Sequence, residues 1–215
     1  MQLSGIYAIT DDNLLPEPTR LEAVAAALGA GISLLQFRSK SGTRASRLKA
    51  AIELLVLCRA HHVPLIINDD VDLCLAADAD GVHLGQRDAA LESARTRLGP
   101  AAIIGVTCHS SVDSAVEAQL AGADYVAFGR FFDSATKPEA PPAQLEILGQ
   151  AKAALSIPIV AIGGINAENG ADVLAAGADM LAVIDAIFGD DQQVRQRTGA
   201  LVRISKQSQR SKPGL

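Results

Sequence analysis

One pattern recurs four times along this chain and limits the folds open to it. An Ala-rich segment ends in glycine or an acidic residue and passes directly into a short apolar run. Glycine just past a helix end adopts the left-handed cap conformation without a side-chain cost. A helix that ends in this way and leads into a strand is the return half of a strand–helix–strand unit. The four instances are residues 28–31 into 32–35, 76–80 into 81–84, 120–124 into 125–128 and 175–179 into 180–184.

Counting the apolar runs predicts eight strands that alternate with helices. Strands are expected near residues 5–9, 32–36, 64–67, 80–84, 102–106, 124–128, 158–162 and 179–184. Helices are expected near 19–29, 43–62, 71–78, 89–98, 111–121, 142–155, 167–176 and 190–204. This alternation predicts an α/β fold, a single-domain (β/α)8 TIM barrel. A doubly wound open sheet is the alternative, but the first strand-to-helix turn lacks the GxGxxG phosphate loop of such folds.

Composition narrows the class of protein. A length of 215 residues suits one domain, with the barrel over 1–204 and a polar, flexible tail over 205–215. The net charge of −5 argues against nucleic-acid binding, which needs a basic face. Three cysteines without CxxC spacing argue against structural zinc or a disulfide framework and favour a reduced, cytoplasmic location.

The ends of the chain and its apolar runs are also informative. The N-terminus leads straight into a predicted strand without the features of a signal peptide. No apolar stretch approaches the length that spans a membrane. A homodimer fits such a barrel, although no exposed apolar stripe can be read from the sequence.

Polar clusters follow at least five of the predicted strands. In a parallel barrel the carboxyl ends of the strands meet at one face, and active sites are built there. Gln36, Arg38 and Lys40 alternate along one strand end and therefore share a face, whereas Phe37 and Ser39 point the other way. A guanidinium fork and an ammonium suit a polyanion such as a diphosphate. The alternative is a solvated strand end whose charges face water.

Oxygen ligands follow two neighbouring strands. Asn68 and Asp69 come after the third predicted strand, and Asp88 comes shortly after the fourth. Mg²⁺ prefers oxygen ligands and commonly binds through one or two carboxylates and substrate phosphates. The sequence therefore predicts a magnesium site, although capping of the following helices by Asp69, Asp70 or Asp88 is the alternative.

Two further strands end in side chains that could contact a ligand. His83 lies in an apolar run between Gly81 and Gly85, which would let a ligand approach the backbone. A satisfied structural histidine is the alternative for this position. Thr107 ends the fifth predicted strand, and no Ser/His/Asp arrangement for covalent catalysis can be read.

The loops after the sixth and seventh strands complete the set. Lys137 follows the sixth strand in the run 134–137. Gly163 and Gly164 follow the seventh, where barrels often bind phosphate through backbone N–H groups, and Asn166 is expected to cap a helix that begins at Ala167. A plain tight turn is the alternative for this glycine pair.

Taken together, these clusters resemble the thiamin phosphate synthase family over residues 7–184. The motifs that carry the resemblance are Gln-Phe-Arg-Ser-Lys at 36–40, Ile-Asn-Asp-Asp at 67–70, Gly-Val-His-Leu-Gly-Gln-Arg-Asp at 81–88, Thr-Cys-His at 107–109, Ser-Ala-Thr-Lys-Pro at 134–138 and Ile-Gly-Gly-Ile at 162–165. Each motif is weak alone, whereas the set in this order is specific.

The resemblance implies an activity and a role for each residue. Enzymes of that family join hydroxymethylpyrimidine diphosphate to a thiazole phosphate and release diphosphate in the presence of Mg²⁺. The implied diphosphate ligands are Arg38, Lys40, Asn68 and Lys137, with Asp69 and Asp88 as metal ligands. The implied pyrimidine-side residues are Gln36, His83 and Thr107. The implied thiazole phosphate ligands are Ser134, Thr136, Gly164 and the backbone at Ile184 and Asp185.

The sequence departs from the family pattern at three positions. Ser39 stands where relatives commonly carry Glu, with little expected effect, and Arg130 stands where many have Pro, so the loop 130–137 is expected to differ in shape. Asp185 stands where relatives often place a small hydroxyl beside the thiazole phosphate. We expect Asp185 to cap a short helix at 186–189, with a charge that opposes a phosphate dianion.

Two other functions compete with the synthase. A thiazole tautomerase on the same barrel would not need the diphosphate ligands or the metal pair. A non-enzymatic barrel that sequesters thiamin precursors would keep the phosphate site, and Asp185 is the residue that favours it.

Overall fold

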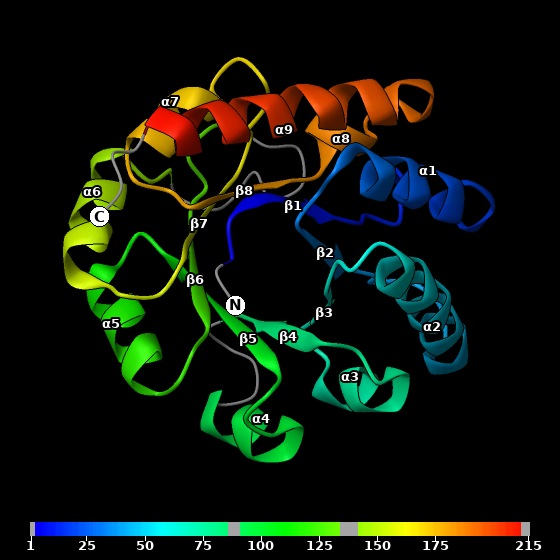
Figure 1. The fold of residues 1–215 in the computed structure, drawn as a ribbon. Helices are drawn as coiled ribbons and strands as arrows, with labels where there is room; N and C mark the ends of the chain where they lie inside the picture. The colour runs from blue at the N-terminus through cyan, green and yellow to red at the C-terminus, as the bar shows by residue number, and fades with distance from the viewer. Residues whose placement is uncertain (1–2, 86–90, 134–141, 212–215) are drawn as a thin grey trace.

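The computed structural model describes residues 3–85, 91–133 and 142–211. Eight parallel strands within these residues close into a barrel in sequence order, with β8 paired to β1 (Figure 1). The predicted (β/α)8 TIM barrel is therefore confirmed. The strands are β1 (Gly5–Ile9), β2 (Leu34–Phe37), β3 (Leu65–Asn68), β4 (Gly81–Leu84), β5 (Ile103–His109), β6 (Tyr125–Phe128), β7 (Ile159–Ile162) and β8 (Met180–Val183).

Helices form a ring outside the strands (Figure 1). They are α1 (Glu17–Ala30), α2 (Arg44–Ala60), α3 (Val71–Ala77), α4 (Leu91–Leu98), α5 (Val112–Leu120), α6 (Glu146–Ala154), α7 (Gly170–Ala175), α8 (Asp185–Phe188) and α9 (Val194–Ser211), with a 3₁₀ turn at Asp191–Gln193. None of the described helices is long and apolar enough to cross a membrane.

The C-terminal helix corrects one sequence prediction. Helix α9 continues to Ser211, whereas the sequence predicted a helix that ends at 204 and a flexible tail over 205–215. Residues 212–215 of that tail lie outside the described residues. The side chains of Leu201, Val202 and Ser205 are buried, and α9 packs against α1, α7 and α8. Packing on the barrel therefore keeps the polar sequence after residue 204 helical as far as Ser211.

The acidic residue in the recurring pattern joins neighbouring strands. In three of the four instances an Asp precedes a strand and binds the first residues of the strand before it in the chain. Its backbone N–H donates to a carbonyl of that strand, and its carboxylate accepts the N–H of the same residue. The pairs are Asp80 with Leu65 (3.0 and 2.7 Å), Asp124 with Ile104 (2.8 and 2.8 Å) and Asp179 with Ile159 (2.8 and 3.0 Å). These carboxylates extend the hydrogen-bond ladder at the amino ends of the strands.

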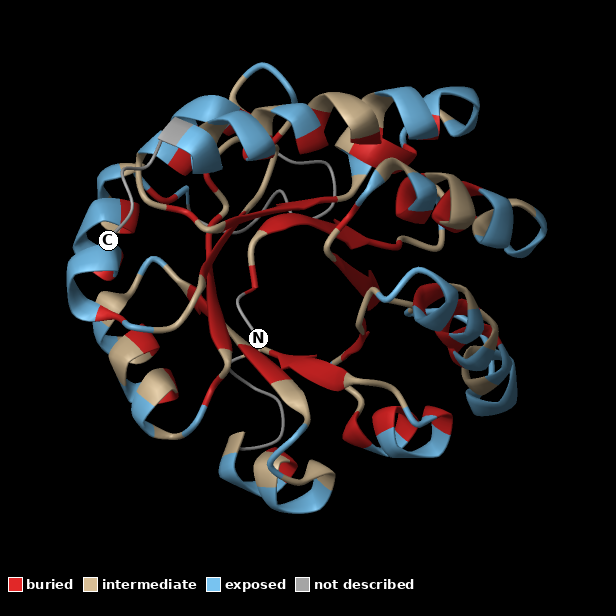
Figure 2. Cartoon of the chain, in the orientation of Figure 1, coloured by how far each residue is buried: buried red, intermediate tan, exposed pale blue. Residues whose placement is uncertain are grey.

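The core has two layers because strand side chains alternate in direction. Ile6 and Ala8 point outward and pack against the helices, whereas Tyr7 and Ile9 point into the barrel. Figure 2 shows buried residues along the strands all round the barrel. Gly105 makes room for an inward ring, since a Cβ on it would lie 1.9 Å from Cζ of Tyr125. Inward-pointing side chains such as Tyr7 and Tyr125 thus fill the barrel interior, and space remains at the carboxyl ends of the strands.

Candidate active site at the carboxyl ends of the strands

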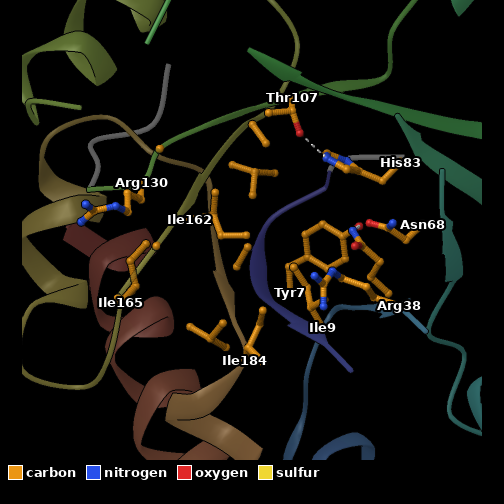
Figure 3. Close-up of a pocket in the computed structure, with 18 of the residues that line it drawn as sticks. Tyr7, Ile9, Arg38, Asn68, His83, Thr107, Arg130, Ile162, Ile165 and Ile184 are labelled. Carbon is orange, nitrogen blue, oxygen red and sulfur yellow. Dashed lines mark hydrogen bonds between the residues drawn. The ribbon is translucent and has the colours of Figure 1, made fainter. Parts of the chain in front are cut away.

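A cavity of about 440 Å³ opens at the carboxyl ends of the strands. Side chains from all eight strands or the loops after them line it. Arg38 and Asn68 lie on one side, and Ile165 and Ile184 lie on the other (Figure 3). Arg130 lies on the same side as Ile165 (Figure 3), so both sides of the cavity carry a charged side chain, and the second side also has glycines and aliphatic residues.

Most of the sequence-predicted site residues come together in this cavity. Those that line it are Gln36, Arg38, Lys40, Asn68, Asp69, His83, Thr107, Gly164, Ile184 and Asp185. Four predicted residues, Asp88, Ser134, Thr136 and Lys137, lie outside the described residues, and their roles stay predictions.

Arg38 is held in place by two residues that follow β1. Its Nη1 donates to Oδ2 of Asp11 at 2.9 Å, and both side chains are largely buried. The hydroxyl of Thr10 accepts from the backbone N–H of Arg38 at 2.9 Å and donates to its carbonyl at 3.2 Å. Phe37 packs in the outer core, as its predicted outward direction requires. The structure thus fixes the guanidinium at the cavity wall.

Asp12 organises the loop that carries Lys40. Its Oδ2 accepts hydrogen bonds from the backbone N–H groups of Lys40 (2.8 Å) and Ser41 (3.0 Å) and from the hydroxyls of Ser39 and Ser41. Burial acts to raise the pKa of this carboxyl, but the hydrogen bonds outweigh it and lower the pKa below 3.8. Asp12 is therefore ionised at neutral pH and anchors the loop. Sequence reasoning missed both Asp11 and Asp12.

The two aspartates after β3 have different roles. Oδ1 of Asp70 accepts the N–H of Leu73 at 2.8 Å and caps α3, so the capping alternative holds for Asp70. Asp69 has a φ of 64°, donates its N–H to the carbonyl of His83 at 2.8 Å, and lines the cavity. Nδ2 of Asn68 donates to Oδ2 of Asp69 at 2.6 Å. This left-handed turn directs the Asp69 carboxylate away from the helix and towards the cavity.

His83 belongs to a hydrogen-bonded chain inside the barrel. Its Nδ1 lies 3.0 Å from the phenol oxygen of Tyr125, and its Nε2 lies 2.8 Å from Oγ1 of Thr107 (Figure 3). Tyr125 in turn contacts Tyr7, whose oxygen accepts from Nε2 of Gln36. Both ring nitrogens of His83 are therefore bonded, and the residue still lines the cavity. Sequence reasoning missed both tyrosines because each lies in an apolar strand.

The loop after β7 differs in detail from the prediction. Gly163 and Gly164 adopt φ values of 104° and 63°, which favour glycine. Asn166 was expected to cap a helix from Ala167, but Oδ1 of Asn166 accepts the N–H groups of Glu168 and Asn169, and α7 begins only at Gly170. Asn166 therefore closes a turn that precedes the helix.

Asp185 corrects a second capping prediction. Helix α8 begins at Asp185 itself, with Ile184 at the N-cap and no side-chain cap bond. A Cβ on Gly189 would lie 2.6 Å from Oδ1 of Asp185, so this oxygen lies beside Gly189. Asp185 is exposed and lines the cavity, and one oxygen of its carboxylate lies near Gly189 at the end of α8.

Arg130 and His109 also line the cavity. Nη1 of Arg130 donates to Oδ1 of Asp133 at 3.0 Å and to the carbonyl of Phe132 at 3.4 Å. The predicted change in the loop 130–137 can be followed only as far as Asp133. His109 has a φ of 50° and lies where the register of β5 against β6 shifts.

Comparisons with known proteins agree with this architecture. The family model described as "Thiamine monophosphate synthase" matches residues 6–187. A thiamine-phosphate synthase of Marinobacter nauticus is 52% identical over 185 residues, which are 86% of this chain and 83% of that protein. One of Thiobacillus denitrificans is 49% identical over 201 residues, 93% of this chain and 94% of that protein.

A solved structure is similar as well. Thiamine phosphate pyrophosphorylase from Pyrococcus furiosus superposes with a TM-score of 0.86 at 37% identity and covers 95% of this chain and 96% of that one. The chain belongs to the thiamine monophosphate synthase family.

Proposed function

We propose that this protein joins hydroxymethylpyrimidine diphosphate to a thiazole phosphate and forms thiamin monophosphate and diphosphate. Family membership supports the activity. The observation that carries the proposal is the cavity, which brings Gln36, Arg38 and Lys40 together on one side and the glycine pair after β7 on the other. These two sides suit two substrates that each carry phosphate.

Arg38 and Lys40 bind the diphosphate of the pyrimidine substrate in this proposal. Arg38 is oriented by Asp11 and Thr10, so its remaining N–H groups can bind phosphate oxygens without further ordering. Asn68 adds a polar side chain at the same wall. Lys137, which lies outside the described residues, is a further diphosphate ligand by resemblance.

The reaction needs charge stabilisation more than acid–base catalysis. When diphosphate leaves the CH₂ carbon beside the pyrimidine ring, the electron-rich aminopyrimidine delocalises the cation that remains. The C–O bond breaks with its electron pair on the diphosphate, and the thiazole nitrogen then forms the C–N bond with its own lone pair. The protein has to neutralise the leaving group and position that nitrogen. A general base is not required, which fits a sequence in which no Ser/His/Asp arrangement can be read.

The glycine-lined side binds the thiazole phosphate in this proposal. Gly164 and the backbone at Ile184 and Asp185 line the cavity there. Glycine lets phosphate oxygens approach backbone N–H groups closely. Ser134 and Thr136, outside the described residues, are the hydroxyl ligands by resemblance.

Magnesium fits the donor atoms on the diphosphate side. Asp69 directs a carboxylate towards the cavity and Asn68 lies beside it, and oxygen donors of this kind suit Mg²⁺. Among the described residues no three His, Cys, Asp or Glu side chains form a metal-binding group. In this proposal substrate oxygens complete the site, and Asp88, outside the described residues, is a further metal ligand by resemblance. Mg²⁺, when bound, neutralises charge on the departing diphosphate.

We also propose a cytoplasmic location. Cys58, Cys74 and Cys108 are free and buried, which fits a reducing compartment such as the cytoplasm. A homodimer stays a prediction from the barrel fold.

The test is formation of thiamin phosphate from the two purified precursors, read as thiochrome fluorescence. Product is expected with Mg²⁺, is expected to disappear with EDTA, and is expected to return when excess Mg²⁺ is added. Binding of both precursors without product would support the sequestering barrel. Isomerisation of a thiazole phosphate without coupling would support the tautomerase. Either result would overturn the synthase.

A further inference from the structure

Five side chains from five strands form one hydrogen-bonded chain inside the barrel. Gln36 (β2) and Thr107 (β5) stand at its ends, and both line the cavity. Tyr7 (β1), Tyr125 (β6) and His83 (β4) connect them. The distances are 2.6 Å from Nε2 of Gln36 to the Tyr7 oxygen, 2.8 Å from Tyr7 to Tyr125, 3.0 Å from Tyr125 to Nδ1 of His83, and 2.8 Å from Nε2 of His83 to Oγ1 of Thr107.

Both phenols keep their hydrogen atoms. Tyr7 is 1% exposed and Tyr125 is fully buried. This burial raises the pKa of each phenol well above its usual value. Each tyrosine therefore contributes one O–H donor to the chain throughout the neutral pH range.

Counting the hydrogen atoms shows in which direction the hydrogen bonds of this five-residue chain are donated. The Tyr7 oxygen accepts an N–H of Gln36, and its other hydrogen-bond partner in the described part of the protein is Tyr125. A buried O–H without an acceptor is costly, so Tyr7 donates to Tyr125. Tyr125 then donates to Nδ1 of His83, which carries no hydrogen. The imidazole hydrogen is on Nε2 and is donated to Thr107.

We propose that Tyr7 and Tyr125 are positioning residues that make the site specific for a 4-aminopyrimidine. This inference rests on the proposed function and adds the residues that set its selectivity. In the direction derived above, Gln36 presents its amide oxygen and a second N–H towards the cavity. That acceptor–donor pair matches the exocyclic amine and the adjacent ring nitrogen of an aminopyrimidine.

At the other end of the hydrogen-bonded chain, the same direction makes the Thr107 hydroxyl a donor. Thr107 accepts from His83, so its own hydroxyl hydrogen is available to an oxygen of the ligand. With the chain reversed, the Gln36 oxygen would accept from Tyr7 and the Thr107 hydrogen would be donated to His83. The reversed site would match a 4-oxopyrimidine, which presents an acceptor where the amine presents a donor.

Binding measurements on the whole protein test the selectivity. Calorimetry compares the 4-amino-pyrimidine diphosphate with its 4-oxo analogue, in the absence of the thiazole substrate. We expect the unmodified protein to prefer the amine by about 100-fold or more and Tyr7→Phe to reduce this preference to within about tenfold, because the amide can then rotate. Thr198→Val is the matched control. It removes another buried hydroxyl, which bonds the Val194 carbonyl in α9, and should leave the preference unchanged.

Nitrogen-15 NMR of the four histidines tests the direction itself. With His83 assigned from a His83→Asn variant, we expect hydrogen on Nε2 and none on Nδ1 in the unmodified protein. Gln36→Glu removes the amide donor, so Tyr7 must donate to the carboxylate and the hydrogen of His83 should move to Nδ1. If Tyr7→Phe fails to fold, Gln36→Glu still tests the direction of the hydrogen bonds. Hydrogen on Nδ1 in the unmodified protein would overturn the inference.

The result separates this inference from the proposed function. Normal thiamin phosphate formation with an unchanged amine preference in Tyr7→Phe would overturn the role of the tyrosines alone. Absence of product and of pyrimidine binding in the unmodified protein would overturn the synthase and, with it, the selectivity that depends on it.

Discussion

Asp11 and Arg38 form a largely buried ion pair at the wall of the cavity. Nη1 of Arg38 lies 2.9 Å from Oδ2 of Asp11, and their side chains are 11% and 13% exposed. Asp11 follows β1 and Arg38 follows β2, so the pair connects two neighbouring strand ends. Asp11 thereby determines where the guanidinium points before any substrate binds.

Removing Asp11 should impair the chemical step. Asp11→Ala leaves Arg38 without its orienting acceptor, and we expect kcat to fall about tenfold because a misplaced guanidinium stabilises the departing diphosphate less well. Steady-state kinetics with both substrates measures the effect.

Asp11→Asn is the matched control. Its amide oxygen still accepts a hydrogen bond, so kcat should stay within about threefold of the unmodified value. Equal activity in Asp11→Ala and the unmodified protein would contradict a role for Asp11 in orienting Arg38.

The charge of Asp185 should weaken binding of the thiazole phosphate. The carboxylate is exposed and leans towards Gly189, so solvent screens its repulsion. We expect Asp185→Ser to lower KM for the thiazole phosphate about threefold at low ionic strength and less at high salt.

Asp185→Asn separates charge from shape. The same decrease in KM is expected, since the amide has nearly the same shape without the charge. An unchanged or raised KM in both variants would show that the carboxylate does not act on the phosphate.

The aspartates that precede strands should stabilise the barrel. Asp80→Ala leaves the N–H of Leu65 without the carboxylate that accepts it at 2.7 Å. We expect the free energy of unfolding to fall by about 1–3 kcal/mol. Urea unfolding measures it, and Asp80→Asn should lose less than half as much because an amide oxygen can still accept. Equal losses in the two variants would mean that the charge, and not the hydrogen bond, matters.

Stability should fall at high pH because of the three buried thiols. Burial raises the pKa of Cys58, Cys74 and Cys108 from 9.0 to about 12. Above pH 9 the unfolded chain releases protons that the folded protein retains. The free energy of unfolding is therefore unaffected by these groups below pH 9 and decreases between pH 9 and 12, by up to about 1.4 kcal/mol per thiol and pH unit.

Urea unfolding in reducing buffer between pH 7.5 and 10.5 checks this sign. Cys108→Val should make the decrease with pH shallower, since one titrating thiol is gone. Stability that is constant or rising over this range would contradict the assignment.

The barrel could be predicted because its signals are local. Glycine or aspartate after an Ala-rich helix preceded four of the strands, and the short apolar runs located all eight, with boundaries within about two residues except at the end of β5, which continues to His109. Gln36, Arg38 and Lys40 could be assigned to one face because strand alternation is strict. All three side chains line the cavity, but β2 ends at Phe37, so the hydrogen bonds to Thr10, Asp11 and Asp12, and not strand alternation, position Arg38 and Lys40.

Other parts of the site depend on contacts between distant residues. Tyr7 and Tyr125 lie 118 positions apart, and each looks like a core residue in its own strand. The caps expected at Asn166 and Asp185 were wrong because nearby backbone geometry moved the helix starts to Gly170 and Asp185. The end of α9 was wrong because the helix packs against α1, α7 and α8, and Ser205, beyond the predicted end, is buried.

The most direct test of the account measures both products in the same samples. Quenched single turnovers with Mg²⁺ and both precursors are analysed for thiamin phosphate and for released diphosphate. We expect the two products to appear at the same rate and in a one-to-one ratio, and we expect EDTA to abolish both. Diphosphate release without thiamin phosphate, or no release while both precursors are bound, would contradict it.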